Sequence, residues 1–220
     1  MTLPRAFLAV LFSGVALAGQ QQDPAKAAAP SSDAKVIAQQ LPSYPLTTCP
    51  ISEEPLESMG KAVDIVHEGH LVRFCCKNCL GKFKKDPAPV LKTIEDAVVA
   101  QQLPKYPLTT CPVSGDALSD KAVNFVQGTR LVRFCCKDCV EGFAKEPAKF
   151  MGAVDKALIA DQKKTYPVST CVVSGEALES GFDYLHGTRL VRFCCEKCVA
   201  EFQKEPTKYL ALLDKANKKS

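Results

Sequence analysis

The 220-residue sequence predicts an α+β fold built from three small modules in tandem. The first observation behind this prediction is an internal repeat, because the twelve cysteines fall into three copies of one pattern, a single cysteine followed by Cys-Cys-x-x-Cys. The second is that each copy carries two short apolar runs around a glycine turn and then apolar residues at helical spacing. One supersecondary unit of about 60 residues per copy is therefore expected.

The cysteine pattern is the same in all three copies. The copies open at Cys49, Cys111 and Cys171. The Cys-Cys-x-x-Cys elements supply the other nine, which are Cys75, Cys76 and Cys79, then Cys135, Cys136 and Cys139, then Cys194, Cys195 and Cys198. Repeated placement of one residue type points to the chemistry of its side chain, and clustered thiolates are typical of metal sites.

The N-terminal residues predict an exported protein. Residues 1–18 are expected to be a signal peptide, because Arg5 is followed by an apolar run that ends in a small-x-small cleavage pattern at Ala18. That run is too short to span a bilayer, so no stable membrane insertion is expected after cleavage. A periplasmic or secreted location follows. Residues 19–35, rich in Gln, Ala, Pro and Ser, are expected to be a disordered linker.

The modules are expected to span residues 36–103, 104–164 and 165–220. Each begins with a turn that contains the opening cysteine, and a β-hairpin follows. The hairpin strands are predicted at residues 63–66 and 71–74, at 123–126 and 131–134, and at 182–185 and 190–193.

Two helices complete each module. The first begins within Cys-Cys-x-x-Cys, because its last cysteine and a phenylalanine four residues later share one helical face, as Cys79 and Phe83 do. A proline ends this helix and suits the first turn of the next one. These prolines are Pro87, Pro147 and Pro206. The apolar stripe of each second helix is expected to be core: Val90, Leu91, Ile94 and Val98, then Phe150, Val154 and Leu158, then Tyr209, Leu210 and Leu213.

A turn, a hairpin and a helix with cysteines at its N-terminus outline a treble-clef-like metal site. In that arrangement the turn usually supplies two ligands as Cys-Pro-x-Cys-Gly, whereas Ser52, Ser114 and Ser174 stand at the second position here, and the helix has gained a cysteine. The helix dipole favours thiolates at this end. Two residues before each cysteine pair, an arginine is expected to add positive charge nearby: Arg73, Arg133 and Arg192.

The repeat resembles the TRASH/YHS superfamily of heavy-metal-binding modules over roughly residues 44–217. The resemblance is carried by Phe74, Cys75, Cys79, Phe83 and Pro87 and their equivalents. The aromatic residue that the family places after the proline is present as Phe150 and Tyr209, and Val90 stands there in the first copy. Heavy-metal sensing, trafficking or resistance is what the resemblance implies.

The resemblance also implies a ligand set, which is Cys49, Cys75 and Cys79, then Cys111, Cys135 and Cys139, then Cys171, Cys194 and Cys198. The chain departs from the family at Cys76, Cys136 and Cys195, where other members commonly have a small residue that binds no metal. Two alternatives stay open: four thiolates bind each ion, or three do. About one Zn²⁺, Cu(I) or other heavy-metal ion per module is expected, because thiolates prefer soft ions.

The sequence therefore predicts an exported protein that binds soft metal ions for buffering, sequestration or relay. The alternative is a protein-interaction array stapled by disulfides or zinc, with a protein partner of unknown identity. A thiol–disulfide oxidoreductase that uses Cys-x-x-Cys is a third hypothesis, although the βαβ pattern that usually surrounds this motif is missing. Catalysis is not expected, because no acid–base pair or nucleophile motif recurs. Basic residues spread through all modules give a net charge of only +4 and favour no nucleic-acid partner.

Overall fold

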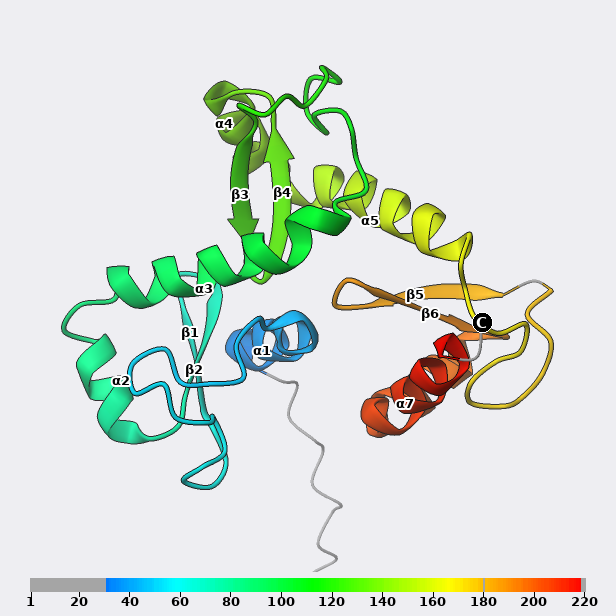
Figure 1. Cartoon of the computed structure of the whole chain (residues 1–220), viewed down its shortest axis with the longest axis horizontal. Helices are drawn as coiled ribbons and strands as arrows, with labels where there is room; N and C mark the ends of the chain where they lie inside the picture. The colour runs from blue at the N-terminus through cyan, green and yellow to red at the C-terminus, as the bar shows by residue number, and fades with distance from the viewer. Residues whose placement is uncertain (1–30, 180, 219–220) are drawn as a thin grey trace, which may run out of the picture.

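The computed structural model describes residues 31–179 and 181–218. The predicted signal peptide and most of the predicted linker lie outside the described residues. Within them, three units of mixed α and β structure follow one another, each with its own two-stranded antiparallel sheet (Figure 1). The predicted α+β fold of three small modules is confirmed.

Helix α1 (Ser32–Gln40) precedes the first module and continues into the 3-10 turn η1 (Leu41–Ser43). The helix begins at Ser32 because the Ser31 hydroxyl accepts a hydrogen bond from the N–H of Ala34 at 3.2 Å. The prediction of a disordered linker as far as residue 35 is therefore wrong for residues 32–35, which form the first turn of α1. The N-cap bond of Ser31 stabilises a helix here, although the composition of the segment is typical of disorder.

Three hairpins form as predicted. They are β1 (Val63–His67) with β2 (His70–Phe74), β3 (Val123–Gln127) with β4 (Arg130–Phe134), and β5 (Phe182–His186) with β6 (Arg189–Phe193). Each closes with two residues, and at least the first of them adopts the positive φ that is typical of such tight turns. Glu68 and Gly69 have φ of 49° and 81°, whereas in the other two hairpins only the first turn residue, Gly128 or Gly187, is left-handed.

The helices also follow the predicted order. They are α2 (Lys77–Phe83) and α3 (Ala88–Gln102), which runs into the 3-10 turn η2 (Leu103–Lys105), then α4 (Lys137–Lys145) and α5 (Pro147–Lys163), then α6 (Glu196–Lys204) and α7 (Pro206–Asn217). A proline lies at the start of each second helix, as expected. In the described part of the chain, no helix combines the length and the apolar character needed to cross a membrane.

Each module has its own small core. The last residue of its second strand packs against the phenylalanine of its first helix, with ring centroids 5.3 Å apart for Phe74 and Phe83. The equivalent pairs are Phe134 with Phe143 at 5.3 Å and Phe193 with Phe202 at 5.4 Å. The opening cysteine and the last cysteine of each module are buried in the same core. The cysteine site is thus anchored to the best-packed part of the module.

Helix α3 serves two modules. Val90 and Ile94 lie in the core of the first module, as predicted. Val98, expected in that same core, instead packs with Val126 and Leu131 of the second hairpin. Packing is therefore continuous across the predicted boundary between residues 103 and 104.

The glutamine that ends or nearly ends each preceding helix holds the next hairpin. The Gln40 side chain donates to the carbonyl of Gly69 at 2.6 Å and accepts from the N–H of Leu71 at 2.8 Å. Gln102 makes the same pair of bonds to Thr129 and Leu131, and Gln162 makes them to Thr188 and Leu190. A helix outside each cysteine site thus fixes the turn of the hairpin that leads to it.

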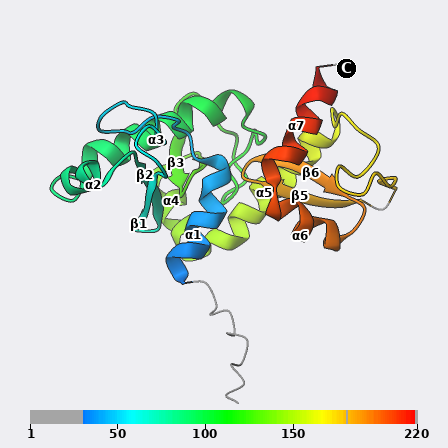
Figure 2. The ribbon, with the colours of Figure 1, turned by 90° about the horizontal axis from the view of Figure 1, so that it is seen from below.

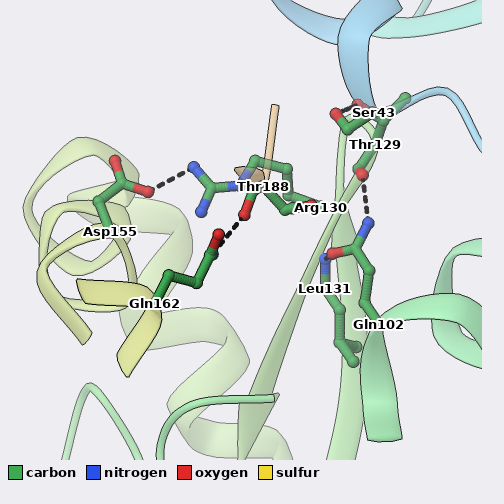
Figure 3. A network of polar contacts seen from close by, with 8 residues as sticks. All are labelled: Ser43, Gln102, Thr129, Arg130, Leu131, Asp155, Gln162 and Thr188. Atoms are coloured by element: carbon green, nitrogen blue, oxygen red, sulfur yellow. Dashed lines mark hydrogen bonds and ion pairs between the residues drawn. The ribbon is translucent and has the colours of Figure 1, made fainter. Parts of the chain in front are cut away.

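The segment 40–43 contacts all three hairpin turns, and we call it the hub. Besides the Gln40 bonds to the first turn, Thr129 of the second turn bonds to the Ser43 hydroxyl at 2.6 Å (Figure 3). Thr129 also donates to the Gln40 carbonyl at 3.1 Å. Thr129 is only 1 % exposed. The third turn packs so closely that a Cβ added to Gly187 would lie 3.0 Å from Ser43 Cβ.

Around this hub the hairpins are arranged with their turns inward. The β3–β4 and β5–β6 turns both point toward α1 (Figure 1), and α1 lies between the first and third modules in the second view also (Figure 2). The cysteine pairs follow the opposite ends of the hairpins, since Phe74 pairs with Val63 at the end away from the turn. A five-residue strand spans about 17 Å, so the three cysteine sites lie at the periphery.

Candidate metal centre

The opening cysteine of each module sits in a tight turn closed by backbone hydrogen bonds. In the first module the N–H of Glu53 donates to the Cys49 carbonyl at 2.9 Å, and the N–H of Cys49 donates to the Glu54 carbonyl at 2.7 Å. The other two modules repeat both bonds. The turn requires a left-handed residue, which is Glu53 with φ of 61° in the first module and glycine in the others, Gly115 and Gly175. Its closure aims the cysteine sulfur into the module.

The other cysteines lie where the second strand changes into a helix. Cys75 directly follows β2, Cys76 is the extended N-cap of α2 with φ of −157°, and Cys79 lies in the first helical turn. The same junction recurs in the second and third modules. This change of backbone conformation brings the first and last cysteines of the element to one side.

Three sulfurs come together in each module. The ligand atoms within each group lie within 4.8 Å of one another, and the groups are Cys49, Cys75 and Cys79, then Cys111, Cys135 and Cys139, then Cys171, Cys194 and Cys198. These nine residues coincide with the ligand set that the family resemblance implies. Most of their side chains are buried, and the opening cysteines are 1–2 % exposed. We call each group the inner triad of its module.

The remaining cysteines, Cys76, Cys136 and Cys195, do not join the inner triads but lie beside them. Their sulfurs are 3.8, 3.7 and 3.9 Å from those of Cys79, Cys139 and Cys198, respectively. Cys136 and Cys195 are exposed, and Cys76 is partly buried. All twelve predicted site residues thus lie at three clusters, nine in the inner triads and three at their edges.

The sulfur spacing fits a bound soft metal ion. With Zn–S bonds of about 2.3 Å, the edge of a tetrahedral thiolate site is about 3.8 Å. The first and last cysteines of the three elements have sulfurs 3.9, 3.6 and 3.7 Å apart. A disulfide needs sulfurs at about 2.05 Å, and all twelve cysteines are free. An all-sulfur donor set suits Zn²⁺ and Cu(I).

A serine hydroxyl borders each inner triad. Ser52 Oγ lies 3.3 Å from Cys75 Sγ, and Ser114 and Ser174 lie at the same distance from Cys135 and Cys194. In the treble-clef pattern these serines stand at the position of a second turn ligand. The structure places them in direct contact with the sulfurs, beside the candidate ion position.

The thiols of one triad differ in acidity. Burial raises the pKa of each opening cysteine, but hydrogen bonds from the neighbouring serine hydroxyl and from backbone N–H groups outweigh it, so that the pKa is about 6 at Cys49, Cys111 and Cys171. Burial raises the pKa of Cys79, Cys139 and Cys198 to about 12. A metal ion bound in the triad would thus displace protons from some of its thiols.

The vicinal cysteines have a different environment. The N–H of Cys79, in the first turn of α2, lowers the pKa of Cys76, and the equivalent N–H groups lower the pKa of Cys136 and Cys195. This agrees with the expected influence of a helix N-terminus on a thiol.

The expected arginine contribution is corrected by the structure. Arg73 Nε lies 2.8 Å from Asp64 Oδ1, and Arg192 Nε lies 3.0 Å from Asp183 Oδ1. Arg133 forms a hydrogen bond to Asn124 in the same place. These side chains lie across the hairpin, where adjacent strands place them opposite the acidic or amide residue. In the first and third modules the aspartate therefore compensates the charge of the arginine, which is directed to the hairpin and not to the thiols.

Comparison of the chain with protein-family models, with curated proteins and with solved structures gives no match. The assignment of the three centres therefore rests on their own geometry and donor chemistry.

Proposed function

We propose that this protein is exported to the periplasm or secreted and binds soft metal ions, one per module, for buffering, sequestration or relay. The observation that carries the proposal is the inner triad, repeated three times with sulfur spacing close to that of a thiolate metal site. Zn²⁺, Cu(I) or another heavy-metal ion suits these donors. The resemblance to TRASH/YHS modules supports the same role, and no catalysis is proposed.

A cargo role is favoured over a purely structural one by the packing of each module. The phenylalanine pair and the second-helix residues form an apolar core beside the sulfurs, and the glutamine contacts hold the hairpin independently of them. A structural zinc site unfolds when the metal is removed, whereas a buffering site must release its ion and remain folded.

The test is metal content and free-thiol count on the mature protein purified without oxygen. About three ions per chain are expected, with thiols that react fully only after chelation, and helical circular dichroism should persist in the stripped protein. Loss of the helical signal on chelation would instead support a zinc-stapled interaction array. No metal, together with a mass lowered by two hydrogens per bridge, would support disulfide staples.

A further inference from the structure

In the second and third modules, a second group of three sulfurs overlaps the inner triad. In the second module, Cys136 Sγ lies 3.8 Å from Cys135 Sγ and 3.7 Å from Cys139 Sγ, and the last two are 3.6 Å apart. The third module repeats this triangle with sides of 3.9, 3.7 and 3.9 Å. We call the three cysteines of each Cys-Cys-x-x-Cys element the outer triad. In the second and third modules its spacing fits a thiolate-bound ion as well as that of the inner triad does.

The two triads of a module have two cysteines in common and differ in the third. In the second module Cys135 and Cys139 belong to both, while the inner triad is completed by Cys111 and the outer triad by Cys136. Cys111 is 2 % exposed, whereas Cys136 is exposed to solvent. An approaching metal ion or chelator can therefore reach the sulfur of Cys136 from solvent, whereas the sulfur of Cys111 is buried.

A serine hydroxyl, and not a fourth sulfur, lies next to the three sulfurs of the inner triad. Ser114 Oγ is 3.3 Å from Cys135 Sγ, on the turn that carries Cys111. Cys136 is held at the N-cap of α4 in an extended conformation, with φ of −153°, and does not join the inner group. The four sulfurs therefore do not form one four-thiolate site. They form a buried position in the inner triad and a second, solvent-accessible position that includes Cys136.

We propose that Cys76, Cys136 and Cys195 are exchange ligands through which the metal ion enters and leaves each module. The ion binds first to the outer triad. The opening thiolate then bonds to it as the vicinal thiolate leaves, while the two shared metal–sulfur bonds persist. The oxidation state of the ion does not change. Protons displaced from the outer-triad thiols when the ion binds, and any proton still on the opening sulfur, go to solvent, and the freed vicinal thiolate can take one up. This inference rests on the proposed function.

Such stepwise replacement is faster than direct release because at most one metal–sulfur bond is broken at a time. An intramolecular thiol held next to the ion also has a high effective concentration. In the first module Cys76 lies 3.8 Å from Cys79, and the same role is assigned to it.

The experiment compares two triple variants of the full chain with the wild type, all loaded with Zn²⁺ under anaerobic conditions. In one variant the vicinal cysteines are replaced (Cys76→Ser, Cys136→Ser, Cys195→Ser). In the matched control the opening cysteines are replaced (Cys49→Ser, Cys111→Ser, Cys171→Ser). Equilibrium affinity is measured by competition with a chromophoric chelator, and zinc transfer to excess chelator is followed by stopped flow. Circular dichroism establishes that both variants are folded.

The vicinal variant is expected to keep its zinc affinity within about threefold of the wild type and to transfer zinc at least about tenfold more slowly. The opening variant is expected to lose affinity by about a hundredfold or more. An equal loss of affinity in both variants would show a permanent fourth ligand and overturn the proposal, as would an unchanged transfer rate. A wild-type chain that takes up no zinc would overturn the proposed function itself, an outcome distinct from either of these.

Discussion

Position 53 shows how one residue can weaken a module without being a metal ligand itself. Glu53 adopts φ of 61° in the turn of the first cysteine, where the other two modules have glycine. A side chain in this left-handed conformation costs about 1 kcal/mol, because Cβ approaches the backbone oxygen. The turn nevertheless forms, since its closing hydrogen bonds and the buried cysteine hold it.

Glu53→Gly should therefore raise the free energy of unfolding of the first module by about 1 kcal/mol or slightly less, because glycine also gains entropy in the unfolded chain. Hydrogen exchange of the turn amides in the metal-free protein measures this. The reverse change, Gly115→Glu, is the matched control and should destabilise the second module by a similar amount. Equal stability of both variants and the wild type would contradict the strain argument.

Position 52 determines the number of sulfurs around the candidate ion. Ser52 Oγ lies 3.3 Å from Cys75 Sγ, so a sulfur placed there would face the inner triad. Ser52→Cys is expected to convert the first module to four inner thiolates and to tighten its Zn²⁺ binding about tenfold or more, by at least about 1.4 kcal/mol. Chelator competition measures the change. Ser58→Cys, in the exposed loop that follows, is the control and should leave the affinity unaltered.

At the scale of secondary-structure elements, each hairpin depends on a glutamine from the helix before it. Leu71 is fully buried, and its N–H is satisfied by Gln40 Oε1 at 2.8 Å. The Gly69 carbonyl of the turn is satisfied by the amide of the same side chain. A backbone N–H that loses its partner at a buried residue costs about 1–3 kcal/mol, whereas the carbonyl of the exposed Gly69 can bond to water instead.

Gln40→Ala should accordingly reduce the protection of the Leu71 amide from hydrogen exchange by about 1–3 kcal/mol. Gln39→Ala is the matched control, because Gln39 is the exposed neighbour on the same helix, and it should leave this amide unchanged. Unaltered protection in the Gln40 variant would show that the hairpin does not need this contact.

At the scale of the whole molecule, the hub joins the modules at the ends of the hairpins that are remote from the metal centres. The bonds of Thr129 to Ser43 and Gln40 lie at the turn, about 17 Å along the strand from the cysteine pair. In the described residues no sulfur of one module joins the triad of another. An ion passing between modules of one chain must therefore travel through solvent or a partner.

The three centres are consequently expected to bind metal independently. Cys111→Ser should lower the stoichiometry from about three ions to about two and leave the other two affinities within about threefold, because sites this far apart without a shared partner behave additively. Anaerobic calorimetric titration with Zn²⁺ measures both quantities. A change of tenfold or more in the remaining affinities would demonstrate coupling through the hub.

The sequence by itself determined the features that depend on local pattern. Pairs of short apolar runs around a glycine turn predicted the hairpins, and Pro87, Pro147 and Pro206 predicted the helix starts, because both signals act over a few residues. The repeat of twelve cysteines placed every candidate ligand. The helical start at Ser32 was also local and could have been found from its N-cap serine.

Only the tertiary structure decided the relations between distant residues. Whether Cys76 or Cys49 completes a triad depends on the side-chain directions at a strand-to-helix junction, which spacing leaves undetermined. The pairing of Arg73 with Asp64 follows from hairpin register. Ser43 meets Thr129 across 86 residues of chain, and Val98 joins the second module; such contacts form because three modules must share one packed centre.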